Sequence, residues 1–171
     1  MSNLEIMKKE LHKAVITPLF EQGFTGKWPH FRREHEAYIE LITFQISKYG
    51  GSFTVELSAV FPYIEDKNYV PWDGLSVDDI DVWNTSDRYR LKGMYDGWFY
   101  YRDLYKKRNG MFGVDYLDVT EKDADGFVPP KGYKCVQHFD AQTAQEICCC
   151  VNLQLKSGFR WLDRFVKRRL R

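Results

Sequence analysis

The sequence predicts an α+β fold, in which an antiparallel sheet carries N-terminal and C-terminal helices packed on one face. Three observations predict it: an amphipathic helical pattern opens the chain, apolar and alternating segments fill residues 28–62, and further helical patterns close it. The length of 171 residues favours a single domain over residues 1–171. A domain of this size buries about 70% of its unfolded surface, so it needs no metal or disulfide to fold.

Residues 3–22 are predicted to form the first helix. Apolar side chains recur there at spacings of three and four, which makes one stripe along a helix: Leu4, Met7, Leu11, Ala14, Val15 and Leu19. Pro18 is expected to kink or shorten the helix, and Gly23 to end it.

Residues 28–62 predict a meander of three strands. The first strand is expected at 28–33 and the second at 38–47, where Ile39 and Leu41 face one way and Ile42, Phe44 and Ile46 the other. A strand that is apolar on both faces belongs in the centre of a sheet. Gly50 and Gly51 predict a tight hairpin turn. The third strand then alternates, with Phe53, Val55, Leu57, Ala59 and Phe61 opposite Thr54, Glu56 and Ser58.

The rest of the chain is predicted to be a long loop, two strands and two helices. Residues 63–87 are expected to be a loop with one helical turn, and two strands follow near 89–94 and 98–102. Residues 103–134 are expected to be loop-rich, with a turn at Asn109-Gly110. Asp140 is a predicted N-cap, Ser157-Gly158 is expected to end that helix, and a last helix carries Phe159, Leu162 and Phe165.

The order of these signals resembles the bacterial domain of unknown function 4304 family. The residues that carry the likeness are Gly23-Phe24, Phe31-Arg32-Arg33, Phe44-Gln45-Ile46-Ser47-Lys48-Tyr49-Gly50-Gly51 and Phe53-Thr54-Val55-Glu56-Leu57. The resemblance is firm over about residues 5–62 and looser to 168, where Trp161-Leu162-Asp163 resembles a C-terminal helical segment. It implies a bacterial, soluble domain and supplies no reaction, cofactor or site residue.

Composition narrows the classes of function. The net charge of +1 attracts neither nucleic acid nor anionic lipid to the chain as a whole. Charged residues are spread through residues 1–15, so we expect no signal peptide there, and we find no apolar run of about 18 residues that could span a membrane. The cysteines are Cys135 and the adjacent Cys148, Cys149 and Cys150, which suit a reducing compartment, so we expect a cytoplasmic protein.

Two alternative kinds of site can be drawn from the sequence. Cys135, His138 and Cys148 carry soft donors that could bind zinc or a small molecule, although adjacent helical cysteines point about 100° apart and Cys148 can equally fill the core. The C-terminal residues from Arg160 onward have a net charge of +5 and could bind nucleic acid weakly. Basic residues at a helix C-terminus also complement the helix dipole.

The main prediction concerns residues 63–87, where seven carboxylates and Lys67 give a net charge of −6. Aromatic residues lie among these acids, a combination that suits a protein partner with a basic surface, although a solvated loop would have the same composition. We find no motif of an enzyme and expect no cofactor. The prediction is therefore a non-enzymatic interaction module, such as an immunity-like protein, that binds through Tyr69, Trp72, Asp78, Asp79 and Asp81.

Overall fold

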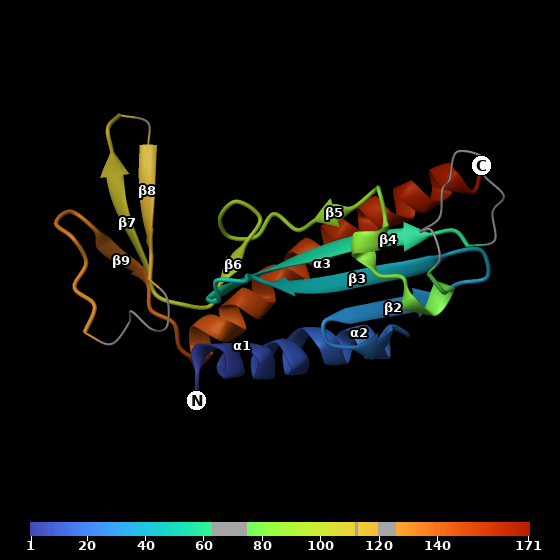
Figure 1. Cartoon of the computed structure of the whole chain (residues 1–171), viewed down its shortest axis with the longest axis horizontal. Helices are drawn as coiled ribbons and strands as arrows, with labels where there is room; N and C mark the ends of the chain where they lie inside the picture. Colours follow the sequence, from blue (N-terminus) through green and yellow to red (C-terminus); the bar gives the residue numbers. More distant parts are fainter. Residues whose placement is uncertain (63–74, 112, 120–125) are drawn as a thin grey trace.

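A computed structural model describes residues 1–62, 75–111, 113–119 and 126–171, and it has the predicted α+β architecture (Figure 1). The main sheet is antiparallel and its strands run in the order β1-β2-β3-β4-β5, with β6 also paired to β4. The strands are β1 Thr25–Lys27, β2 His30–Glu34, β3 Ile39–Ile46, β4 Ser52–Val60, β5 Tyr89–Arg90 and β6 Phe99–Tyr100. Within the described residues, no helix is long and apolar enough to cross a membrane.

The N-terminal helical segment runs without a break from Asn3 to Glu21, as the sequence predicts. It comprises α1 (Asn3–Leu11), a π-helical turn η1 (His12–Ile16) and α2 (Thr17–Glu21). Ser2 begins it with a capping box, in which its side chain accepts from the Glu5 amide and Glu5 accepts from the Ser2 amide. Pro18 lies just after η1 and does not interrupt the helical segment, and Gly23 follows α2 with φ of 88°.

The strand β3 lies at the centre of the main sheet, which confirms the prediction from its apolar faces. Its full length pairs with β4, from Ile39 opposite Val60 to Ile46 opposite Phe53. Gly50 and Gly51, with φ of 75° and 68°, form the predicted turn between them. The predicted first strand at 28–33 is found as β2, which begins at His30. Residues 28 and 29 instead connect it to β1, a strand that was not predicted and that pairs with β2 as a hairpin.

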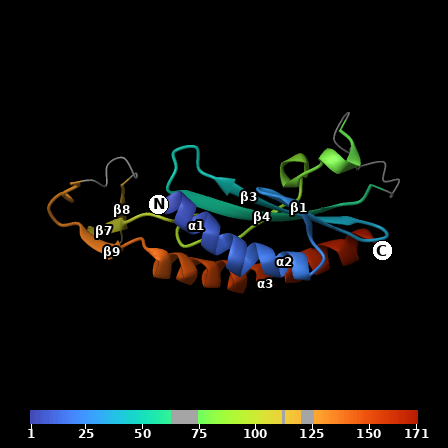
Figure 2. The ribbon, with the colours of Figure 1, turned by 90° about the horizontal axis from the view of Figure 1, so that it is seen from below.

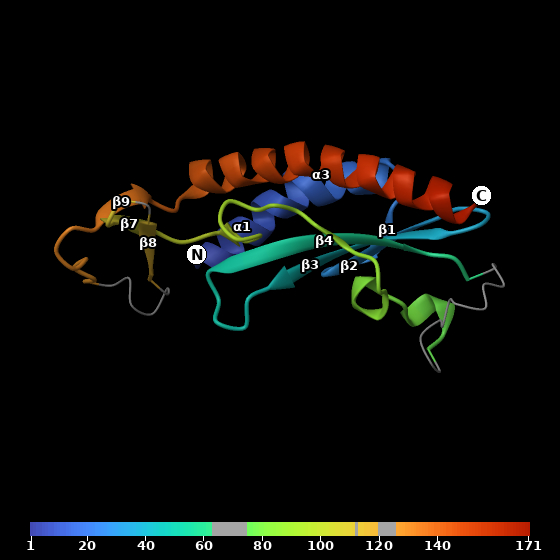
Figure 3. The same cartoon turned by 90° about the horizontal axis from the view of Figure 1, so that it is seen from above.

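The helices cover one face of the sheet, and two short 3-10 turns lie against the other face (Figure 3). Between helices and sheet lies the main core, which includes Leu11 and Val15 of the N-terminal segment, Phe44 and Phe53 of the strands, and Val151 of the last helix. Figure 2 shows the N-terminal segment beside that last helix along the same side of the sheet. Burial of this apolar surface is the main stabilising contribution.

The last helix, α3, is continuous from Ala141 to Arg169, so the predicted break at Ser157-Gly158 is wrong. Asp140 is its N-cap, as predicted, and accepts from the Thr143 amide at 2.7 Å. Gly158 lies in the middle of α3 and against the sheet. A Cβ there would be 3.1 Å from both Leu57 methyl groups, which shows that glycine permits close packing at this point rather than ending the helix.

A second sheet lies beyond the end of the main one and was not predicted (Figure 1). Its strands are β7 Leu104–Asn109, β8 Gly113–Asp118 and β9 Lys134–Gln137, in the order β8-β7-β9. The turn predicted at Asn109-Gly110 joins β7 to β8. The predicted strands at 89–94 and 98–102 shrink to β5 and β6, because Gly93, Asp96 and Gly97 take positive φ between them.

The face of β4 that carries Thr54, Glu56 and Ser58 is buried, although polar alternation usually marks a solvent-facing side. A second apolar cluster lies on this face and joins Ile39, Leu41 and Val60 of the strands to Ile80 and Val82. The latter two belong to the segment with the 3-10 turns η2 (Val77–Asp79) and η3 (Val82–Asn84). Part of the acidic segment is therefore packed on the sheet.

Candidate functional site

The acidic residues Asp78, Asp79 and Asp81 belong to a compact turn that caps itself. The Ser76 hydroxyl accepts from the Asp78 amide at 3.2 Å and begins η2. The Asp81 carboxylate accepts from the Trp83 amide at 2.6 Å and begins η3. Ile80, buried between the two turns, anchors the segment to the sheet. Asp78 and Asp79 remain exposed. We call residues 76–84 the acidic turn.

Arg32 of β2 fixes the acidic turn to the sheet. Its guanidinium donates from Nη1 to the Asp78 carbonyl and from Nη2 to the Val77 carbonyl, both at 2.9 Å. The planar guanidinium fork with two adjacent acceptors sets orientation as well as position. Because Arg32 binds the main-chain carbonyls of the turn, the carboxylates of Asp78 and Asp79 are free to face solvent.

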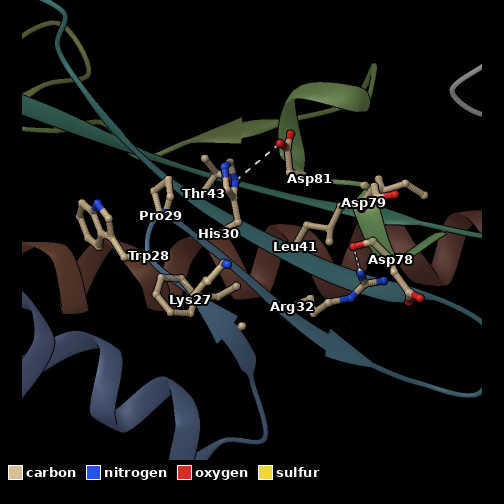
Figure 4. Close-up of a pocket in the computed structure, with 13 residues that line it drawn as sticks. Lys27, Trp28, Pro29, His30, Arg32, Leu41, Thr43, Asp78, Asp79 and Asp81 are labelled. Carbon is tan, nitrogen blue, oxygen red and sulfur yellow. Dashed lines mark hydrogen bonds and ion pairs between the residues drawn. The ribbon is translucent and has the colours of Figure 1, made fainter. Parts of the chain in front are cut away.

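A pocket of about 390 Å³ lies between the acidic turn and the β1–β2 hairpin (Figure 4). One wall is formed by the three aspartates, and the other by residues 27–30 of the hairpin. Leu41 and Ile80 supply apolar lining. The volume falls in the range of sites that hold a small molecule, and it also suits one long side chain.

His30 connects the two walls of the pocket. Its Nδ1 lies 3.0 Å from the Thr43 hydroxyl and 3.6 Å from the Asp81 carboxylate, which the close-up shows directly (Figure 4). The ring of Trp83 meets the imidazole edge to face at 5.0 Å. Trp83 itself is 46% exposed, so an aromatic side chain lies beside the acidic wall. The imidazole therefore lies between Thr43 of β3 and the acidic turn.

The structure brings together three of the five predicted site residues. Asp78, Asp79 and Asp81 all line the pocket, whereas Tyr69 and Trp72 lie outside the described residues. The hairpin residues Lys27, His30 and Arg32 were missed. Arg32 appeared only within Phe31-Arg32-Arg33 of the family resemblance, and nothing in that motif indicates a partner about 50 residues further along the chain.

The residues of the predicted zinc site do not come together. Cys148 is a core residue with no exposed surface, and burial raises its thiol pKa to about 12, with the Glu10 carboxylate adding to the effect. The Cys135 thiol donates to the Gln137 carbonyl at 3.2 Å, and His138 pairs with Asp103 at 3.3 Å. Among the described residues, no group of three or more His, Cys, Asp or Glu side chains could hold a metal ion.

The three cysteines in sequence on α3 divide as their helical spacing predicts. Cys148 faces the core, and Cys149 and Cys150 are exposed. The interpretation of Cys148 as a small hydrophobic core residue is therefore confirmed.

Comparisons with known proteins support a family and no function. No curated protein and no solved structure gives a significant match to the chain. A family model described as a domain of unknown function (DUF4304) matches residues 15–108, which is more than half of the chain and includes every strand of the main sheet. It also includes the whole acidic turn and both walls of the pocket. The chain therefore belongs to the DUF4304 family.

Proposed function

We propose that the protein is a non-enzymatic interaction module, in which the pocket beside the acidic turn receives a basic side chain from a partner protein. The observation that carries this proposal is the pair of hydrogen bonds from Arg32 to the carbonyls of Val77 and Asp78. They hold the main chain of the acidic turn in one position, so the turn itself needs no ordering when a partner binds. Preorganisation of this kind lowers the entropic cost of association.

The chemistry of the pocket matches an arginine or lysine side chain. Such a side chain has an apolar stem and a charged head, and it buries the stem while the head seeks a polar partner. The half-buried Trp28 and Pro29 offer apolar surface for the stem, and Asp78 and Asp79 offer carboxylates for the head. The half-exposed Trp83 beside this wall supports the proposal, because tryptophan is enriched among the anchor residues of interfaces.

The cysteines support a place in the cytoplasm. All four are free, and Cys149 and Cys150 are exposed, which suits a compartment that keeps thiols reduced. An immunity-like protein that blocks a cationic toxin would use the same chemistry as the proposed pocket.

The proposal is tested by an NMR titration of the ¹⁵N-labelled protein with a short glycine-serine peptide that carries two arginines. The matched control is the same peptide with citrulline, which keeps the shape of arginine and lacks its charge. We expect the arginine peptide to shift the amides of residues 27–32 and 76–84, and the citrulline peptide to leave them in place. Equal shifts with both peptides, or shifts confined to other parts of the chain, would overturn the proposal.

A further inference from the structure

The outward face of α3 carries a line of cations that the proposed pocket does not use. The six residues are exposed: Lys156, Arg160, Arg164, Lys167, Arg168 and Arg171. Arg171 lies two residues beyond the end of α3. At about 100° per residue the other five fall within an arc of about 120° and extend over about 18 Å of helix, with the exposed Asp163 at the edge of that arc. We call them the basic stripe. α3 forms an outer layer of the molecule (Figures 2 and 3). The stripe lies on the side of α3 opposite the buried Leu155, Leu162 and Val166, so it faces away from the sheet.

Four members of the stripe line a hollow of about 340 Å³ with Trp161 at its side. The indole ring of Trp161 is parallel to the ring of Phe165, with 5.1 Å between centroids and 5° between planes. Tyr89 packs against it at 5.6 Å. These contacts hold the indole in place, so the hollow combines four cations with a fixed aromatic edge.

The helix dipole accounts for only part of the stripe. Its effect fades within the last turn of a helix, whereas Lys156, Arg160 and Arg164 lie earlier in α3. Among the described residues, no carboxylate pairs with Arg164, Lys167, Arg168 or Arg171. Arg169, on the other side of the helix, pairs with Asp87 at 3.2 Å. Arg169 is therefore neutralised by a carboxylate, whereas the four cations of the hollow can meet an external anion.

From this arrangement we infer that the basic stripe binds single-stranded nucleic acid. A line of cations matches an anion whose charges repeat along a line, as phosphates do in a nucleic-acid backbone. The fixed indole in the hollow offers an aromatic contact to a base, and only an unpaired strand presents its bases in that way.

The small net charge of the whole chain does not oppose this inference, because the charges are separated in space. The acidic turn lies on one side of the sheet and α3 on the other (Figure 3). A nucleic acid that follows α3 meets the local field of the stripe, since the Debye length is only about 8 Å at physiological salt. The net charge of +1 predicts no attraction for nucleic acid only because it sums the acidic turn and the basic stripe.

The test is fluorescence anisotropy with a labelled oligothymidylate over a series of salt concentrations. We expect binding at low salt, with log K falling against log salt by about 0.7 for each phosphate contact. Changing Arg164, Lys167 and Arg168 together to Gln should weaken binding at least about tenfold at low salt and reduce the salt slope by about 2. The matched control changes the exposed Lys9, Lys13 and Arg108 to Gln, which removes the same charge elsewhere and should change neither quantity.

Four outcomes would overturn the inference. They are no binding at the lowest salt, equal losses in the stripe variant and its control, tighter binding to a duplex of the same length, and equal binding to polyglutamate or to phosphatidylserine vesicles. The last two would assign the stripe to a different polyanion. Circular dichroism of the variants separates loss of binding from loss of fold.

Discussion

Arg32 of β2 donates a hydrogen bond to the main-chain carbonyl of Asp78, 46 residues further along the chain, at 2.9 Å. This bond and its companion to Val77 join the two segments that form the pocket. Hydrogen bonds in which the donor is charged contribute about 1.5–3 kcal/mol, so the pair is strong enough to decide where the acidic turn lies. The proposed function depends on that placement.

Replacing Arg32 with alanine is expected to release the acidic turn while leaving the sheet intact. Two carbonyls lose their donor, but Ile80 and Val82 keep their apolar contacts with the sheet. Hydrogen exchange should therefore quicken at the amides of Asp79 and Asn84, which the turns protect, and stay slow in β3 and β4. Unchanged exchange in the acidic turn would show that Arg32 does not hold it.

Replacing Gly158 with alanine is expected to lower the free energy of unfolding by about 1 kcal/mol. The new methyl group would lie 3.1 Å from Leu57, which has no exposed surface, and overpacking of a core costs about 1–3 kcal/mol. The gain in helix propensity from glycine to alanine offsets about 0.8–1.0 kcal/mol of that. Urea denaturation measures the difference, with exposed Gln145→Ala on α3 as a near-neutral control. A net stabilisation would mean that the Leu57 side chain can move aside without loss of packing energy.

The central part of the fold was predictable because local patterns and tertiary packing agree there. Both apolar faces of Ile39–Ile46 lie against packed residues, and the Gly-Gly turn needs positive φ that only glycine adopts freely. Gly158 shows where local patterns fail. A glycine after a serine resembles a helix end, and only the position of Leu57 across the core reveals its actual role.

The second sheet and the pocket could not be predicted for a different reason. Residues 104–109 read Leu-Tyr-Lys-Lys-Arg-Asn and are mostly exposed, so β7 buries too little apolar surface to leave a pattern of alternation. The pocket depends on hydrogen bonds between residues more than 40 positions apart. The three acids of the turn were predictable from charge, but their partners Arg32 and His30 were not.

Alkylation should distinguish Cys148 from the adjacent Cys149 and Cys150 by their reactivity. At pH 8, iodoacetamide is expected to modify the exposed Cys149 and Cys150 and to spare Cys148, whose thiol is buried with a pKa of about 12. Peptide mass spectrometry with and without urea measures this. Modification of Cys148 at the same rate as its neighbours in the folded protein would contradict its place in the core.

The Cys148 thiol should also make the free energy of unfolding fall as pH rises into the alkaline range. Its pKa is raised from the ordinary value of 9.0 to about 12 in the folded protein, so the unfolded chain loses its proton first as pH rises. The contribution of the protonated Cys148 thiol to the free energy of unfolding is fully present below pH 9 and is lost progressively as pH rises towards 12. The difference in stability between the wild type and Cys148→Ala should shrink over this window. A difference that stays constant with pH would show that the buried thiol does not titrate as described.

Binding of a cationic side chain by Asp78 and Asp79 is tested by calorimetry with the arginine peptide at low salt. The variant changes Asp78 and Asp79 to Asn and leaves Asp81, which caps η3, untouched. The matched control changes the exposed Glu36 and Asp115 to Gln and Asn, which removes the same charge away from the pocket. Exposed ion pairs contribute about 0.2–1 kcal/mol each, so loss of both carboxylates should weaken binding by up to about 30-fold. We expect this loss in the pocket variant and an unchanged Kd in the control. Equal affinity in both variants would show that these carboxylates do not bind the cationic side chain.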